Sequence, residues 1–174
     1  MGDKLKYIAF LRGINVGKIR IKMADLKKAF ETMGFSEVTT FLQTGNVTFF
    51  SSEPVDVIKS ILEKGLSQTF QYEAYVLIYP YPVLEGIIKG YPMARVETHH
   101  AYVLFVENPE VFAVLKGLAA DISDSREKIV ADNQVFYWQV ERGESTDTTF
   151  SKILAKAKFK STTTVRNVNT LELM

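Results

Sequence analysis

The sequence predicts an α+β protein of the α/β plait kind, built from two successive βαββαβ halves. Short apolar segments of strand length alternate with segments of helical periodicity, and the same order of elements occurs twice in 174 residues. A stretch rich in proline and glycine separates the two runs. We therefore expect a first half over residues 1–79, a linker with a short helix over 80–97, and a second half over 98–174.

The first half opens with the apolar segment 7–11, which is typical of a buried strand. Apolar residues then recur at helical spacing over 23–33, and Gly34 is a favourable helix end. Pro54 opens a second helix, because proline suits the first helical turn. The other strands are expected at 38–43, 47–51 and 74–79, the first two joined by a turn at 44–46.

The second half repeats this order. A strand is expected over 100–106, and Asn108 followed by proline predicts the capped start of a helix. A longer helix is expected over 148–158, and Asn167 is expected to cap a short final helix. The other expected strands are a hairpin, 128–131 with 135–140, and a short strand at 163–166.

The order βαββαβ is the split βαβ arrangement of ferredoxin-like folds. Right-handed crossovers place the first and third strands at the centre of each sheet. The segments 7–11 and 102–106 are apolar on both faces, so we expect both faces of each sheet to be covered.

Composition narrows the class of protein. The chain has no cysteine, which excludes disulfides, thiolate metal sites and a cysteine nucleophile. No apolar run approaches the roughly 20 residues of a membrane span, and residues 1–4 do not resemble a signal peptide, so we expect a cytoplasmic protein that does not enter membranes. Net charge is uneven: +5 over residues 1–35, −8 over 36–150 and +4 over 151–174. Such asymmetry indicates either an anion-facing surface or solvated helix faces.

Two basic, amide-rich clusters are the candidate binding sites. The exit of the first strand and the turn between the next two strands share one sheet edge, where backbone N–H groups, an arginine and amides suit an anion. This first cluster comprises Arg12, Gly13, Asn15, Gly17, Lys18, Gln43, Gly45 and Asn46. In the second half, the start of the 148–158 helix is expected beside the end of the last strand. That second cluster comprises Ser151, Lys152, Arg166, Asn167 and Asn169. Turn formation and helix capping are the alternative explanations for both clusters.

Familiar catalytic motifs are missing from the sequence. The segment Gly13–Lys18 has three residues between its glycines and is followed by Ile19, so it does not match a phosphate-binding P-loop. His99 and His100 are adjacent and would point to opposite faces of a strand, which favours a structural role over a shared metal. No nucleophile or acid–base pair can be assigned, and we expect neither a cofactor nor a metal.

Five segments of the chain have a distinctive sequence: residues 7–17 (YIAFLRGINVG), 23–26 (MADL), 42–47 (LQTGNV), 151–154 (SKIL) and 164–170 (TVRNVNT). Together they resemble an uncharacterised bacterial family, domain of unknown function 1697. The chain has Gly17-Lys18 where the family usually has two glycines, and Val168 where it usually has tryptophan. The resemblance implies two ferredoxin-like halves and marks both clusters as signature segments, but it supplies no activity.

The sequence therefore favours a protein that recognises a phosphorylated small molecule or a nucleotide through these basic loops. One alternative is an enzyme that acts on a small phosphorylated or carboxylated substrate. Nucleic-acid binding is a weaker alternative. RNA-recognition modules of similar topology expose aromatic residues on their central strands, whereas the central strands of this chain are expected to be covered on both faces. The remaining alternative is a protein-interaction module. The sequence leaves the oligomeric state open.

Overall fold

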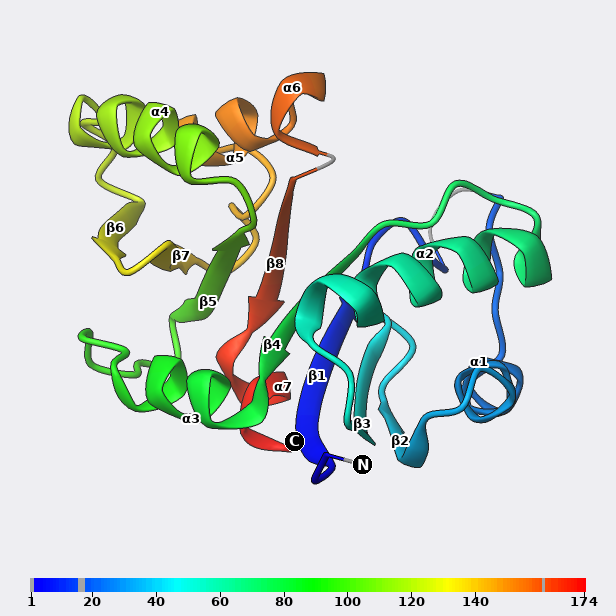
Figure 1. The fold of residues 1–174 in the computed structure, drawn as a ribbon. Helices are drawn as coiled ribbons and strands as arrows, with labels where there is room; N and C mark the ends of the chain where they lie inside the picture. The colour runs from blue at the N-terminus through cyan, green and yellow to red at the C-terminus, as the bar shows by residue number, and fades with distance from the viewer. Residues whose placement is uncertain (1, 16–17, 161) are drawn as a thin grey trace. The chain divides into compact units, whose positions relative to one another are not determined.

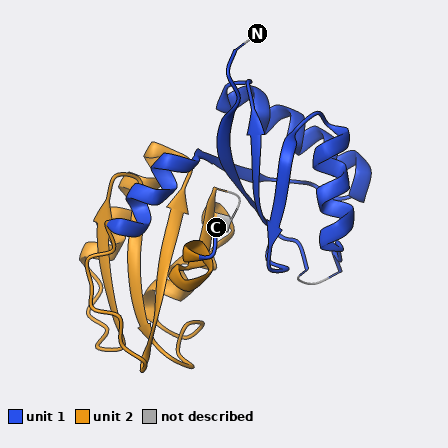
Figure 2. Cartoon of the chain, turned by 90° about the horizontal axis from the view of Figure 1, so that it is seen from below, with its two compact units in different colours: residues 1–89, 173–174 blue, residues 90–172 orange. Residues whose placement is uncertain are grey.

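The computed structural model describes residues 2–15, 18–160 and 162–174. The chain divides into two compact units, which Figure 2 colours separately: residues 1–89 with 173–174, and residues 90–172. The boundary falls between Lys89 and Gly90, inside the segment 80–97 that the sequence suggested as a linker.

The first unit contains β1 (Leu5–Leu11), α1 (Met23–Thr32), β2 (Ser36–Phe41), β3 (Asn46–Ser51), α2 (Val55–Phe70), β4 (Val76–Pro80) and α3 (Tyr81–Lys89). Its described strands form a sheet in the order β2-β3-β1-β4, with every neighbouring pair antiparallel. The predicted ferredoxin-like order is thus present, with β1 and β3 at the centre (Figure 1). The α3 helix, expected inside a linker, contacts β1 and β4.

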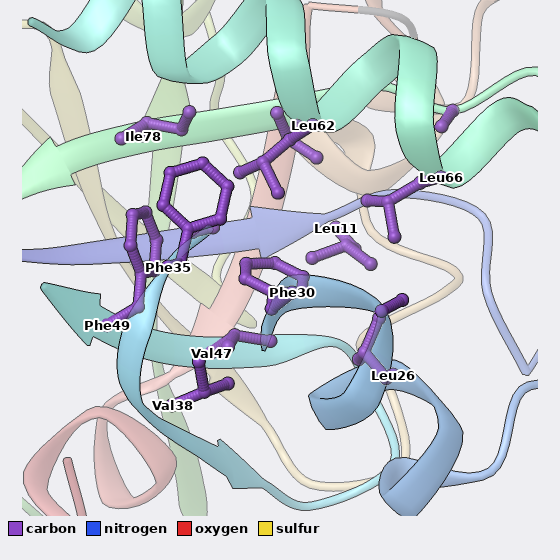
Figure 3. Packing of buried hydrophobic residues seen from close by; sticks show 14 of the residues in the cluster. Leu11, Leu26, Phe30, Phe35, Val38, Val47, Phe49, Leu62, Leu66 and Ile78 are labelled. Atoms are coloured by element: carbon purple, nitrogen blue, oxygen red, sulfur yellow. The ribbon is translucent and has the colours of Figure 1, made fainter. Parts of the chain in front are cut away.

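The core of the first unit lies between this sheet and the helices α1 and α2 (Figure 3). Leu26 and Phe30 are one helical turn apart on α1, as are Leu62 and Leu66 on α2, and all four are fully buried. Phe49 of β3 packs against the ring of Phe30, with 5.6 Å between ring centroids. Burial of each such side chain contributes about 1.5–3 kcal/mol, so these residues fix the helices on the sheet.

The second unit contains β5 (His99–Val106), α4 (Pro109–Ala120), β6 (Glu127–Asp132), β7 (Val135–Glu141), α5 (Thr149–Leu154), α6 (Ala157–Lys160), β8 (Thr163–Asn167) and α7 (Val168–Glu172). The sheet order β6-β7-β5-β8 repeats that of the first unit. The Asn108 side chain accepts hydrogen bonds from the N–H groups of Glu110 and Val111, as expected of an N-cap.

Both faces of the central strands are buried, as the sequence predicts. Ala9 and Leu11 of β1 belong to the core described above, and Ile8 and Phe10, which point to the opposite face, are also fully buried. In the second unit, Leu104 faces the helices and Val103 is buried on the other face. Over the described residues, no helix has the length and apolar character needed to cross a membrane.

The long helix predicted in the second half differs from the structure. The helix expected over 148–158 is divided into α5 and α6, with a break near Ala155 and Lys156. Phe150 and Phe159 both lie in the core of the second unit. Nine residues of continuous α-helix would place them on opposite sides of the helix, because each residue turns it by about 100°. The break lets both rings reach the core.

Candidate functional site

The first predicted cluster is assembled at the end of the first sheet where β1 stops and the β2–β3 turn lies. The N–H of Leu11 donates to the carbonyl of Gly45 at 2.8 Å, which joins the end of β1 to the β2–β3 turn. The N–H of Arg12 donates to the carbonyl of Tyr75 at 3.0 Å, just before β4 begins. Three segments that are distant in the sequence therefore meet at the first predicted cluster.

Asparagine side chains hold these loops together. Asn15 Nδ2 donates to the Gln43 carbonyl at 2.6 Å, and Asn15 Oδ1 accepts from the N–H of Ile21 at 2.9 Å. Asn46 is fully buried, and its Nδ2 donates to the Phe41 carbonyl at 2.9 Å. These amides therefore build the loop, which is the structural alternative the sequence left open.

The glycines of the cluster serve different purposes. Gly45 has φ +87°, and an added Cβ would lie 2.8 Å from Leu11 Cβ, so the turn needs glycine there for both conformation and space. Gly13 has φ +70° with nothing within 4 Å of an added Cβ, so its backbone is open to a ligand. Gly17 lies outside the described residues, and Lys18 is exposed.

Arg12 is partly buried, and the fold leaves its guanidinium available to a ligand. Its side chain is half-buried, and over the described residues no carboxylate, carbonyl or hydroxyl accepts a hydrogen bond from its guanidinium. Burial lowers the pKa of the Arg12 guanidinium, although an arginine remains protonated at neutral pH. Arg12 is thus a cation partly removed from water without a described counter-ion.

The second predicted cluster is not brought together. Ser151 Oγ donates to the Thr148 carbonyl at 2.8 Å, and Lys152 Nζ lies 3.6 Å from Asp147. Arg166 is buried and donates to Thr164 Oγ1 and to the Val165 carbonyl. Each of these contacts lies within a single segment of the chain.

The sheet order explains this separation. In the order β6-β7-β5-β8, the strands β6 and β8 form opposite edges of the sheet. The N–H groups of Thr149 and Phe150, in the first turn of α5, donate to the carboxylates of Asp124 and Glu127. The start of α5 is therefore held beside the start of β6, and the expectation that it lies beside the end of β8 is wrong.

Asn167 and Asn169 instead line a cavity of about 200 Å³ with Arg95, His99, His100 and Arg142. The sequence analysis missed both arginines and assigned the histidines to structure. Arg142 follows β7 directly, and the antiparallel register of β5 and β7 pairs His99 with Glu141. The register of these two central strands, deduced from their sequence patterns, is the signal that would have found this group. Within the described residues, no group of three or more His, Asp or Glu side chains could hold a metal ion.

Comparison with known proteins identifies the family. Residues 5–137 match the model of the family described as Protein of unknown function (DUF1697), and the chain belongs to this family. The resemblance seen in the sequence is thereby confirmed. A search of curated proteins gives no match.

Two solved structures are similar to different degrees. The conserved bacterial protein SP0830 from Streptococcus pneumoniae has a TM-score of 0.82 at 22% identity, over 98% of this chain and 96% of that one, which shows a shared fold. An unknown protein from Galdieria sulphuraria is 11% identical over 95% of this chain and 99% of that one, with a TM-score of 0.28.

Proposed function

We propose that this protein binds a phosphorylated small molecule or a nucleotide at the loop after β1, with Arg12 as the principal contact to the phosphate. The observation that supports this is the half-buried Arg12 guanidinium, which has no partner over the described residues. A partly desolvated cation without an acceptor lowers the stability of the fold, because no hydrogen bond offsets the loss of water. A bound phosphate would supply the missing acceptors in the two-pronged geometry that guanidinium groups favour.

The charge around Arg12 favours the same ligand. Lys18, Arg20 and Lys22 are all exposed in the segment that leads to α1. No Asp or Glu occurs between Asp3 and Asp25. A run of cations without acidic neighbours raises the local concentration of anions, and backbone N–H groups in an open glycine loop add further donors.

The sheets argue against recognition of RNA on a strand surface. RNA-recognition modules stack bases on exposed aromatic side chains of their central strands. Here Tyr7, Phe10 and Phe49 of the first sheet are buried, as are Phe105 and Phe136 of the second. We therefore favour a small ligand over nucleic acid, and we assign no reaction because the loop offers no nucleophile.

A thermal-shift screen of the full chain against phosphorylated metabolites, nucleotides and short oligonucleotides tests the proposal. Ligand at 100 times its Kd stabilises a protein by about 2.7 kcal/mol, which raises Tm measurably. The stabilisation by a hit should disappear in Arg12→Gln. It should persist in Lys64→Gln, which removes one exposed positive charge from α2 of the same unit.

Arg12→Met separates binding from folding. Methionine keeps the length of the side chain and removes the partly buried charge, so the ligand-free variant should be as stable as the wild type or more stable. It should nevertheless show no ligand-dependent rise in Tm. A hit that stabilises Arg12→Met and the wild type equally would contradict the role of Arg12.

A further inference from the structure

The cavity of the second unit lies where several chain segments end or begin. Arg95 precedes β5, His99 and His100 open β5, Arg142 follows β7, and Asn167 ends β8. All of them line the same space of about 200 Å³, so cationic and amide side chains from separate segments surround one cavity. This cavity is independent of the Arg12 loop, because every residue that lines it belongs to residues 90–172.

Hydrogen bonds position Arg142 and His100 in this cavity. Arg142 Nε donates to the carbonyl of Glu97, and Arg142 Nη1 lies 3.4 Å from His100 Nδ1. A guanidinium nitrogen can only donate, so His100 Nδ1 is the acceptor and the neutral ring carries its proton on Nε2. Over the described residues, no carboxylate pairs with Arg142. The Arg142 guanidinium and His100 Nε2 are therefore donors without an anion.

The charge balance of the cavity depends on His100. Arg95 is paired with Glu172 at 2.8 Å, and its Nη2 also donates to Asn169 Oδ1. Glu97 lies in the wall of the cavity, so the formal charges of the two arginines and of Glu97 and Glu172 cancel. Protonation of His100 adds one positive charge, which favours the binding of an anion.

Several titratable or charged groups lie around the cavity that contains His100. They are Arg142 from the end of β7, His99 and Tyr102 on β5, Glu141 opposite His99, Arg95 and Glu97 before β5, and Glu172 paired with Arg95. Burial, and then the charge of Arg142, lower the pKa of His100. An oxyanion between Arg142 and His100 would offset that repulsion, so His100 would take up a proton as the anion binds.

We propose that this cavity is a second binding site, which takes the phosphate group of a phosphate monoester between Arg142, His100 and Asn167, with uptake of a proton by His100. A tetrahedral phosphate offers three acceptor oxygens, which suits donors that come from three segments. The second ionisation of a phosphate monoester has a pKa near 6, in the range where histidine titrates. Binding of the ligand and protonation of His100 are therefore coupled.

The two histidines of the chain make the test specific. His99 and His100 are the only histidines in the sequence, and both line this cavity, so their ring protons in a ¹H NMR spectrum report on this site alone. We would titrate the full-length protein between about pH 5 and 8 with inorganic phosphate, and in parallel with methyl phosphate. Sodium chloride at equal ionic strength controls for screening. We expect either phosphate to raise the pKa of His100, by about one unit if the protonated form binds tenfold more tightly.

Variants determine whether the cavity causes that shift. Arg142→Gln should lose it, whereas Lys116→Gln, an exposed charge removed from α4 of the same unit, should keep it. Asn167→Asp provides a second variant. Its carboxylate can still cap α7 by accepting from the N–H of Asn169, but it removes an amide donor and repels phosphate.

Two results would overturn the proposal. One is a pair of histidine signals that phosphate leaves unchanged across the titration, and the other is an equal shift with chloride. Arg12→Gln should keep the full histidine shift, because it alters the other unit. The proposal for the Arg12 loop can therefore fail while this one holds, and the reverse is also true.

Discussion

Gly13 and Gly45 both have positive φ angles but differ in their surroundings, which allows conformation and packing to be measured separately. Gly45→Ala would place a methyl group 2.8 Å from Leu11 Cβ and 3.0 Å from Ile14 Cδ1. We expect a loss of about 2–4 kcal/mol in the free energy of unfolding, from left-handed strain and overpacking together. Gly13→Ala should lose only about 1 kcal/mol, because its Cβ meets nothing. Urea unfolding of the two variants measures both values, and equal losses would contradict the packing argument.

Asp124 gives the folded protein a pH dependence of defined sign. Side-chain hydrogen bonds from Arg126 and backbone N–H groups of Arg126 and Thr149 hold the pKa of Asp124 well below its usual range. A carboxylate with a depressed pKa stabilises the fold above its unfolded pKa of about 3.9, and this contribution is lost as the pH falls toward the folded pKa. Between about pH 4 and 2, the free energy of unfolding of Asp124→Asn should therefore fall less steeply than that of the wild type.

Urea unfolding at a series of pH values in this range checks the Asp124 prediction. Asp3→Asn, which removes an exposed carboxylate near the N-terminus, should retain the slope of the wild type. Identical slopes for wild type and Asp124→Asn would show that Asp124 does not contribute to acid unfolding.

The β6–β7 turn has a sequence that is not optimal for its backbone conformation. Asn133 and Gln134 both have positive φ angles, 44° and 68°, which is the signature of a type I′ turn. Asparagine tolerates this region, but glutamine does so poorly, and glycine is the preferred second residue. We expect Gln134→Gly to stabilise the protein by about 0.5–1 kcal/mol.

Thermal and urea unfolding of Gln134→Gly, compared with Gln134→Ala, measure this effect. The alanine variant should gain nothing, because it also has a Cβ in the left-handed region. A glycine variant less stable than the wild type would mean that the Gln134 side chain makes a contribution larger than the strain.

Element boundaries show what a sequence pattern can establish. The β2–β3 turn was expected at 44–46, but it begins at Leu42, which has φ 58°, and Asn46 is already in β3. Side chains determine this difference, because Asn46 Nδ2 donates back to the Phe41 carbonyl and to Thr44 Oγ1. Periodicity predicts that a hairpin exists, whereas its boundary depends on individual hydrogen bonds that periodicity does not contain.

The strand order of both sheets and the convergence of the first cluster could be predicted from the sequence, but the convergence of the second cluster could not. Element order and crossover handedness fix strand order, and strand order alone brings Arg12 to the turn that contains Gly45. The second cluster required the position of α5 along the sheet, which Asp124 and Glu127 fix from distant positions. The cavity of the second unit was missed because Arg95 and Arg142 belong to no spaced motif.

The two proposed sites lie in separate units, which have separate sheets and cores, so their occupancies should be independent. Equilibrium dialysis with radiolabelled phosphate near pH 6 should give about two phosphates per chain, because both sites accept the same group. Arg12→Gln and Arg142→Gln should each reduce this to about one, and the double variant should bind none above background. If one single variant lost both phosphates, the units would be coupled and independence would be wrong. If Arg12→Gln retained both, the loop after β1 would not be an anion site, and the cavity beside Arg142 would have to be judged by its histidine signals alone.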